Sequence, residues 1–204
     1  GHTDASAEVT AAAVAAGVSH ATHLFNGMRP LAHRDPGPAG ALLDRQVTCE
    51  VIADGTHLDD TVIRLIARAA GPGNLVLITD AMAAAGMPDG TYRLGGLAVT
   101  VTAGTARLAP AGATMSPSAA APGEPLGSIA GSTATMDQVV RHAITAAGLP
   151  VPDVAAAAST TPARRLGLAA ETGALRPGLA ADLVLLDEDF RLRTVLAAGT
   201  VIPA

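Results

Sequence analysis

Three histidines and one aspartate occur at spacings that could gather metal-binding and acid–base side chains in one place. They are His2, His23, His57 and Asp80, and the gaps between them are 21, 34 and 23 residues. Each follows a segment that predicts a β-strand, or stands where a strand would end, and each gap suits one strand–helix unit. In a (β/α) barrel, the carboxyl ends of the strands meet at one rim, where the active sites lie. Imidazole and carboxylate groups at that rim would suit metal binding and proton transfer.

The segment 19–37, SHATHLFNGMRPLAHRDPG, contains three of the six histidines of the chain. His20 and His23 are three residues apart, so on a strand their side chains point to opposite faces and cannot both bind one ion. We expect His23, which is nearer the end of the strand, to be the candidate ligand. His20 is expected to pack against a neighbouring helix.

The same segment also carries groups that suit an anion. Asn26 and Gly27 predict a turn with free backbone N–H groups, and Arg34 carries a forked cation that is always charged. Turn amides together with an arginine are suited to a phosphate or a carboxylate. The spacing is equally compatible with a surface ion pair between Arg34 and Asp35 or Asp44.

The elements that would position these groups alternate along the first part of the chain. Alternating or continuous apolar residues predict strands at 18–25, 46–55 and 74–80, and helical periodicity predicts helices at 3–17 and 58–71. The third strand, NLVLITD, is apolar throughout, as expected for a strand buried on both faces. This order is typical of a parallel α/β sheet or barrel.

The two predicted helices have recognisable ends and faces. Thr3 or Asp4 is expected to cap the first helix, which Gly17 ends. The second helix is expected to bury one apolar face, formed by Val62, Ile63, Ile66 and Ala69.

After Asp80 the pattern changes from alternating strands and helices to shorter elements. Residues 91–108 predict antiparallel β-hairpins, and the Pro-, Ala- and Ser-rich segment 109–125 predicts a surface loop. A helix is expected from Ser132 or Thr133 to Ala147, with His142 on its surface. Further along the chain, we expect helical pieces at 151–159 and 161–168, and two or three short strands within 173–202.

Composition excludes several classes of protein. The 204 residues carry a formal charge of −5, and no segment concentrates the 13 Lys and Arg residues, so a nucleic-acid surface is not expected. No apolar run reaches the roughly 18 residues that a membrane span needs. The single cysteine, Cys49, excludes an internal disulfide, as is typical of a reducing cytoplasm.

Six separated motifs resemble one known family. In order they are GHTDAS, ATHLFNGMRPLAHRDPGPAGALL, VIADGTHLD, LITDAMAAAG, GSIAGSTATMD and the pair TPARRLGL with GALRPGLAADLVLLD. Together they resemble the C-terminal half of the N-acetylglucosamine-6-phosphate deacetylase family, in the amidohydrolase superfamily. Enzymes of this family hydrolyse the acetamide of N-acetylglucosamine 6-phosphate, which gives glucosamine 6-phosphate and acetate.

The resemblance implies an α/β fold, namely the C-terminal part of a TIM-like (β/α) barrel and part of a small β-sandwich domain. Residues 1–90 would be barrel strand–helix units with the metal and catalytic motifs, and residues 91–133 a β-hairpin and Pro/Ala-rich loop. Residues 134–170 would be helices that complete the barrel, and residues 171–204 strands of the sandwich. In the complete enzyme, the family implies a cytoplasmic homodimer.

The resemblance also assigns roles to individual residues. His2 and His23 match two ligands of one divalent metal ion per subunit, which in this family is often zinc, although iron and other divalent ions suit the same ligands. Asp80 matches the catalytic aspartate. The residues that match contacts to the phosphorylated amino sugar are Asn26, Gly27, Arg34, His57, Ile129, Ala130 and Gly131.

The chain resembles only half of the family's length, and this leaves alternative functions open. The third metal ligand, a glutamate, and a further substrate-binding histidine are expected in an N-terminal half that this sequence does not include. The loop 109–125 looks longer than its family counterpart, and a surface excursion is expected there. The alternatives are an amidohydrolase for another amide or a cyclic imide, and a truncated, non-catalytic remnant.

Overall fold

The computed structural model describes residues 1–71, 73–109 and 127–202. Its first sheet contains strands β1 (His20–Ala21), β2 (Thr48–Ile52) and β3 (Leu75–Ile78), in the order β1-β2-β3, and both pairs are parallel. Helix α2 (Gly37–Asp44) connects β1 to β2, and helix α3 (Asp60–Ala70) connects β2 to β3. The predicted alternation of strands and helices with parallel pairing is therefore confirmed.

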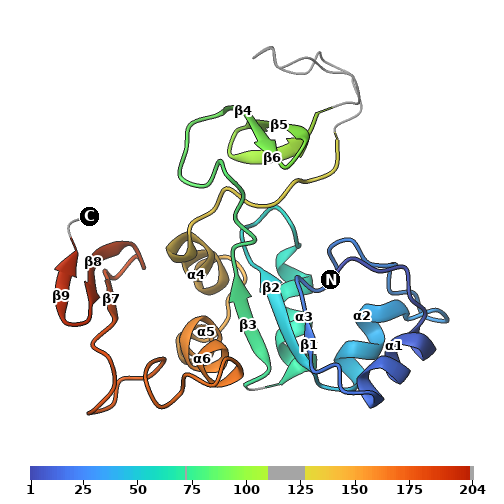
Figure 1. Cartoon of the computed structure of the whole chain (residues 1–204), viewed down its shortest axis with the longest axis horizontal. Helices are drawn as coiled ribbons and strands as arrows, with labels where there is room; N and C mark the ends of the chain where they lie inside the picture. Colours follow the sequence, from blue (N-terminus) through green and yellow to red (C-terminus); the bar gives the residue numbers. More distant parts are fainter. Residues whose placement is uncertain (72, 110–126, 203–204) are drawn as a thin grey trace.

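The main hydrophobic core surrounds this first sheet. Val51 of β2 and Leu77 of β3 are buried, as are Ile63 and Ile66 of α3. Figure 1 shows α3 beside β2, and the helices α4 (Met136–Thr145), α5 (Val151–Ala155) and α6 (Thr161–Arg165) beside β3. The prediction that Ala69 lies on the buried face of α3 is wrong: Ala69 is exposed, and the face continues through Ala70.

Strand β1 is shorter than the predicted strand 18–25, because the backbone turns immediately after it. His23 and Phe25 have positive φ angles of 33° and 75°, which a β-strand cannot accommodate. Helix α1 (Ala7–Ala15) begins after Ser6, whose hydroxyl accepts a hydrogen bond from the Val9 N–H. The prediction that Thr3 or Asp4 caps this helix is therefore wrong.

The second sheet is an antiparallel meander. Strands β4 (Gly90–Leu94), β5 (Leu97–Thr102) and β6 (Thr105–Leu108) pair in sequence order, which confirms the predicted hairpins. Figure 1 shows this sheet above the carboxyl end of β3. The predicted loop 109–125 lies, apart from its first residue, outside the described residues.

Helix α4 (Met136–Thr145) starts later than predicted because Thr135 and Gln138 form a reciprocal capping box at its N-terminus. Helices α5 (Val151–Ala155) and α6 (Thr161–Arg165) are joined by a π-helical segment, Ala156–Thr160. The two predicted helical pieces thus form one continuous helical stretch.

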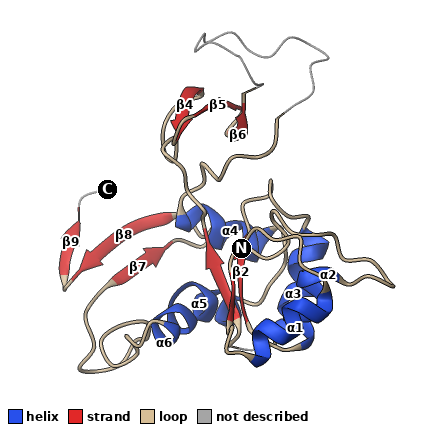
Figure 2. Ribbon diagram, turned by 45° about the vertical axis from the view of Figure 1, so that its right-hand side comes forward, coloured by secondary structure: helices blue, strands red, loops and turns tan. Residues whose placement is uncertain are grey.

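The third sheet contains the antiparallel strands β7 (Leu183–Leu186), β8 (Leu192–Ala197) and β9 (Thr200–Ile202). This confirms the strands expected in the C-terminal segment. Figure 2 shows the sheet at the side of the molecule. A mixed helix-and-sheet fold is confirmed, and none of the helices in the described ranges has the length and apolarity to cross a bilayer.

Candidate active site

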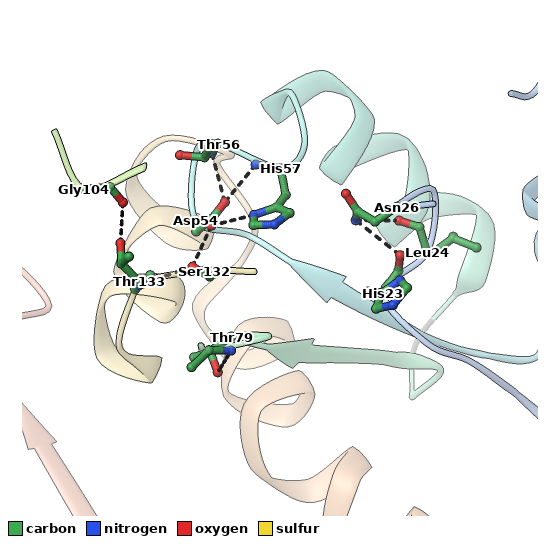
Figure 3. Close-up of polar contacts among 12 residues, drawn as sticks. His23, Leu24, Asn26, Asp54, Thr56, His57, Thr79, Gly104, Ser132 and Thr133 are labelled. Carbon is green, nitrogen blue, oxygen red and sulfur yellow. Dashed lines mark hydrogen bonds and ion pairs between the residues drawn. The ribbon is translucent and has the colours of Figure 1, made fainter. Parts of the chain in front are cut away.

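Three of the four predicted polar groups follow neighbouring parallel strands. His23 comes two residues after β1, His57 five residues after β2, and Asp80 two residues after β3. The strands are parallel and adjacent, so all three residues lie at the same edge of the sheet. Figure 3 shows His23 and His57 at this edge, with Thr79 at the end of β3.

His2 reaches the same edge through a short backbone pairing. The Thr3 N–H donates to the Gly27 carbonyl at 2.9 Å, and the Arg29 N–H donates to the Thr3 carbonyl at 3.1 Å. These bonds place the His2 ring beside the His23 ring, with their centroids 4.9 Å apart and their planes tilted by 50°. The two histidines are 21 residues apart in sequence but neighbours in space.

One atom of this histidine pair is left without a partner. His23 Nδ1 is buried and makes no hydrogen bond with any described residue. A buried imidazole nitrogen normally has a hydrogen-bond partner, so an orphan nitrogen beside a second imidazole fits the role of a metal ligand. Within the described residues, however, no group of three or more His, Cys, Asp or Glu side chains could hold an ion. The chain therefore offers a pair of ligands rather than a complete site.

Gly27 makes room for the His2 ring. A Cβ at position 27 would lie 2.2 Å from His2 Cδ2, and the φ of Gly27 is +61°. Asn26 uses its side-chain amide to close the preceding turn, donating to the carbonyls of His23 at 3.2 Å and Leu24 at 3.3 Å. The turn is thus built around the two histidines. Its predicted contact with a phosphate stays a prediction.

Arg34 is exposed and forms no ion pair with any described residue. Its two expected surface partners are taken by other arginines: Asp35 lies 3.7 Å from Arg29, and Asp44 lies 3.4 Å from Arg45. The surface ion pair of Arg34 with Asp35 or Asp44, which was the alternative to anion binding, is therefore not formed. The guanidinium of Arg34 remains available to a ligand.

His57 is held by a buried carboxylate that the sequence analysis did not single out. Both side chains are 5% exposed, and His57 Nδ1 lies 2.8 Å from Asp54 Oδ2. Asp54 Oδ1 accepts from the N–H groups of Thr56 at 2.9 Å and His57 at 3.0 Å, and the Ser132 hydroxyl donates to Oδ2 at 2.8 Å. Figure 3 shows these four contacts converging on Asp54.

The charge of Asp54 is fixed by these contacts. Burial alone raises the pKa of the carboxyl, but the hydrogen bonds from His57, Thr56 and Ser132 outweigh it and hold the pKa well below its ordinary value. Asp54 is therefore a carboxylate at neutral pH. A local sequence pattern could have indicated Asp54. Asp-Gly follows a buried strand, with a histidine three residues after the aspartate, and this pattern is typical of an Asx turn.

Asp80 is exposed and has a left-handed backbone conformation, with φ +51°. Non-glycine residues adopt this conformation at a cost of about 1–2 kcal/mol, so its surroundings must hold it there. The Ser132 N–H donates to the Asp80 carbonyl at 2.9 Å, and the Met82 N–H donates to the Ser132 carbonyl at 2.9 Å. This short parallel pairing fixes the backbone of Asp80.

The segment Ile129–Gly131 leads directly into this pairing. Ala130 is buried, and its N–H donates to the Ala106 carbonyl of β6 at 3.0 Å. The segment therefore connects the second sheet to Asp80. Its contact with a substrate stays a prediction.

Two other histidines have carboxylate partners that the sequence did not indicate. His20 Nε2 lies 2.8 Å from Glu50 Oε1, and the second Glu50 oxygen accepts from the His23 N–H at 3.3 Å. His142 is not a plain surface residue: its Nε2 lies 2.7 Å from the Asp60 carboxylate, which connects α4 to the N-terminus of α3. Both carboxylates are far from their histidines in sequence, so local patterns did not show them.

Comparison with known proteins places the chain among amidohydrolases. A model of the Amidohydrolase family matches residues 1–202. N-acetylglucosamine-6-phosphate deacetylase from Lysinibacillus sphaericus is 38% identical over 202 residues, which are 98% of this chain and 48% of that protein. N-acetylgalactosamine-6-phosphate deacetylase from Escherichia coli O157:H7 is 38% identical over 200 residues, with coverage of 98% and 48%.

A solved structure is similar as well. It is a mutant N-acetyl-D-glucosamine-6-phosphate deacetylase from Mycobacterium smegmatis in complex with N-acetyl-D-glucosamine 6-phosphate, with a TM-score of 0.83 and 46% identity. The alignment covers 98% of this chain and 50% of that one. The chain thus spans about half the length of the curated relatives that it matches.

Proposed function

Because the chain belongs to the amidohydrolase family, we propose that it forms the C-terminal half of a metal-dependent deacetylase. The proposed reaction is hydrolysis of the acetamide of N-acetylglucosamine 6-phosphate to glucosamine 6-phosphate and acetate. The proposal rests on the arrangement of side chains at the carboxyl edge of the first sheet. There, His2 lies beside His23 and its orphan Nδ1, next to strands that lead into His57 and Asp80. The names of the similar proteins support this substrate class.

His2 and His23 are the residues of this chain that would hold one divalent ion. Catalytic zinc sites usually have three protein ligands, so a third, proposed to be a glutamate, would come from outside these 204 residues. Zinc is the proposed ion, although iron and other divalent ions suit the same ligand types. When bound, such an ion lowers the pKa of a coordinated water to about 7.

Asp80 is the proposed acid–base residue. Its carboxylate would take a proton from the water that attacks the acetyl carbonyl and would give that proton to the amine nitrogen as the C–N bond breaks. The exposed position of Asp80 at the sheet edge supports this role, because its carboxylate is open to a substrate there. The Ser132 pairing would keep it in place during the transfer.

The substrate phosphate is proposed to bind Arg34 together with the turn at Asn26 and Gly27. The free guanidinium of Arg34 supports this, because a forked cation can form paired hydrogen bonds with phosphate oxygens. His57 and the segment Ile129–Gly131 would contact the sugar. Phosphate binding away from the reacting bond would fix the orientation of the acetamide.

The finer architecture is part of the same proposal. We propose that β1–β3 are strands of a TIM-like barrel and that β7–β9 belong to a small β-sandwich, with the boundaries given above. The parallel order of β1–β3 and the TM-score of 0.83 support this assignment. The full-length enzyme is proposed to be a cytoplasmic homodimer, and the free, buried Cys49 is compatible with a reducing compartment.

Replacement of Asp80 tests the proposed reaction. In the full-length protein, Asp80→Asn is expected to lower kcat for acetate release from N-acetylglucosamine 6-phosphate by about 10²- to 10⁴-fold, since proton transfer contributes that much. Metal content and the circular dichroism spectrum should stay unchanged. Asp44→Asn, which alters an exposed aspartate paired with Arg45, is the matched control and should leave kcat unchanged. Turnover retained in Asp80→Asn would refute the assignment.

Arg34 separates this function from hydrolysis of another amide or a cyclic imide. Arg34→Ala is expected to lower kcat/KM for the phosphorylated sugar roughly 10- to 100-fold, the size of a lost charge-assisted hydrogen bond. The unphosphorylated sugar should be affected little. Arg45→Ala is the control, because Arg45 already has a carboxylate partner. Equal losses for both substrates would favour the other amidohydrolase.

A second candidate substrate is the C4 epimer, N-acetylgalactosamine 6-phosphate. A relative named for that substrate is as similar to this chain as the relative named for N-acetylglucosamine 6-phosphate, at 38% identity in both cases. The two epimers share the acetamide and the phosphate, so the residues discussed above would serve either sugar. The ratio of kcat/KM for the two substrates would decide between them.

A further inference from the structure

We propose that Asp54 is a positioning residue that holds His57 as its Nδ1–H tautomer and ties it, through Ser132, to the backbone of Asp80. The effect on catalysis rests on the proposed function, whereas the tautomer itself does not. Asp54 has no role in the site as described so far, although it is the most densely bonded carboxylate at this edge of the sheet.

The hydrogen-bond donors around Asp54 fill both of its oxygens. Oδ1 accepts the two backbone N–H groups of Thr56 and His57, and Oδ2 faces the Ser132 hydroxyl and His57 Nδ1 at 2.8 Å each. A carboxylate has about four acceptor positions and no hydrogen to give. His57 Nδ1 must therefore carry the hydrogen of this contact. The hydrogen-bond network thus fixes the tautomer.

Burial makes the other tautomer costly. The two side chains are each 5% exposed, so an unprotonated Nδ1 would face a carboxylate oxygen with no water to separate the two lone pairs. Leaving a buried polar group unsatisfied costs about 1–3 kcal/mol. The Nδ1–H form therefore predominates in the neutral imidazole.

The tautomer decides what His57 offers to a ligand. Nε2 makes no hydrogen bond with the described residues, so it carries a free lone pair when Nδ1 holds the hydrogen. Such an atom accepts a hydrogen bond, and a sugar hydroxyl is the matching donor. A phosphate oxygen, which can only accept, does not match a neutral Nε2. The geometry thus points to a hydroxyl of the sugar as the group that His57 contacts.

Ser132 extends the influence of Asp54 to the acid–base residue. Its hydroxyl accepts the Ala134 N–H at 3.0 Å, which leaves its hydrogen for Asp54. Its backbone N–H donates to the Asp80 carbonyl, and its own carbonyl accepts the Met82 N–H. Ser132 is only 2% exposed. One carboxylate therefore restrains both the ring of His57 and the strained peptide of Asp80.

The test is the tautomer of His57 in the full-length protein, measured by ¹⁵N NMR on histidine-labelled samples. The His57→Gln variant identifies the His57 signals. At a pH at which the imidazole of His57 is neutral, the wild type is expected to show a protonated Nδ1 and an unprotonated Nε2. Asp54→Asn is expected to reverse this, because the amide nitrogen that replaces Oδ2 donates to Nδ1 and moves the ring hydrogen to Nε2. A wild-type spectrum with the hydrogen on Nε2 overturns the proposal, even if the variant fails to fold.

Kinetics form the second part of the test. Asp54→Asn should lower kcat/KM for acetate release about 10- to 100-fold, as outer partners of functional histidines do. Ser132→Ala should keep the wild-type tautomer and lower kcat more than it raises KM, because it loosens Asp80 alone. The matched control is Asp60→Asn, which breaks the aspartate–histidine pair with His142 and should leave kcat/KM unchanged.

The outcomes separate this inference from the proposed function. An Asp54→Asn variant that keeps the hydrogen on Nδ1 overturns the positioning role, whatever its activity. An equal loss of kcat/KM in Asp60→Asn also overturns it, because the effect would then be general destabilisation. A wild-type enzyme that releases no acetate from either epimer refutes the proposed function, whereas the tautomer spectra still decide the role of Asp54.

Discussion

Strands β3 and β7 have nearly the same sequence and opposite surroundings. Leu75–Ile78 reads LVLI and Leu183–Leu186 reads LVLL. Val76 of β3 is 5% exposed, whereas Val184 of β7 is 61% exposed. Helices α3, α4 and α6 contact β3, while the main contact of β7 is its neighbour β8. An apolar run therefore identifies a strand, but burial depends on what lies over the sheet.

The largest expected difference between the two regions is in the free energy of unfolding. Leu77→Ala in β3 should lower it by about 2–5 kcal/mol, because a cavity would form in a packed core. Leu185→Ala in β7 should change it by no more than about 0.5 kcal/mol, because the side chain is already 48% exposed. Urea unfolding of the 204-residue chain measures both. Similar losses at the two positions would show that β7 is covered in solution.

A smaller difference is expected in the response to acid. Hydrogen bonds hold the pKa of Asp54 below the ordinary value of about 3.9 despite its burial. The folded state therefore binds its proton later than the unfolded chain as pH falls. The resulting stabilisation is complete above about pH 5 and is lost as the pH drops toward the folded pKa. Asp54→Asn should thus make the decline in stability between about pH 5 and pH 2 shallower.

Asp187, beside the third sheet, is the comparison for this prediction. The pKa of its carboxyl is lowered first by the Arg191 N–H and then by nearby groups that include Arg193, at a more solvent-accessible place. Asp187→Asn should therefore change the decline in the free energy of unfolding at low pH less than Asp54→Asn does, because water screens the contacts of Asp187. Denaturant unfolding at a series of pH values is the measurement. A larger change at Asp187 would reverse the ranking of the two regions.

The last comparison measures the reactivity of a thiol in each region and not a change in stability. Cys49 in β2 is fully buried, and burial raises the pKa of its thiol to about 11. It should therefore not react with a disulfide reagent at pH 8 in the folded chain and should react fully in urea. A thiol introduced by Val184→Cys should react at once under the same conditions. Rapid labelling of native Cys49 would show that the first sheet opens far more often than its packing indicates.

Much of the fold follows from local patterns. The continuous apolar run of β3 and the 3.6-residue periodicity of α3 predict these elements, and the alternation of strands and helices predicts the parallel order. The length of β1 could not be predicted, because positive φ angles at His23 and Phe25 end it and these residue types do not require them. Burial on the third sheet could not be predicted either, for the reason that β3 and β7 illustrate.

Part of the candidate site could likewise be predicted from the sequence, and part could not. The spacing of strand ends indicated His2, His23, His57 and Asp80, because parallel strands bring their carboxyl ends to one edge. The bond between Asp54 and Ser132 could not be predicted, since the two residues are 78 positions apart and nothing in either local sequence points to the other. Roles that depend on tertiary hydrogen bonds are thus less visible in a sequence than roles that depend on topology.

Gly27 has a consequence for how this chain can vary in evolution. Any side chain there would meet the His2 ring at 2.2 Å and would also have to adopt a left-handed φ. In a deep mutational scan for activity, we expect codon 27 to tolerate only synonymous third-base changes. Codon 96, whose glycine has open space around it, should accept most substitutions. A single absent methyl group is thus expected to restrict this position of the turn to glycine.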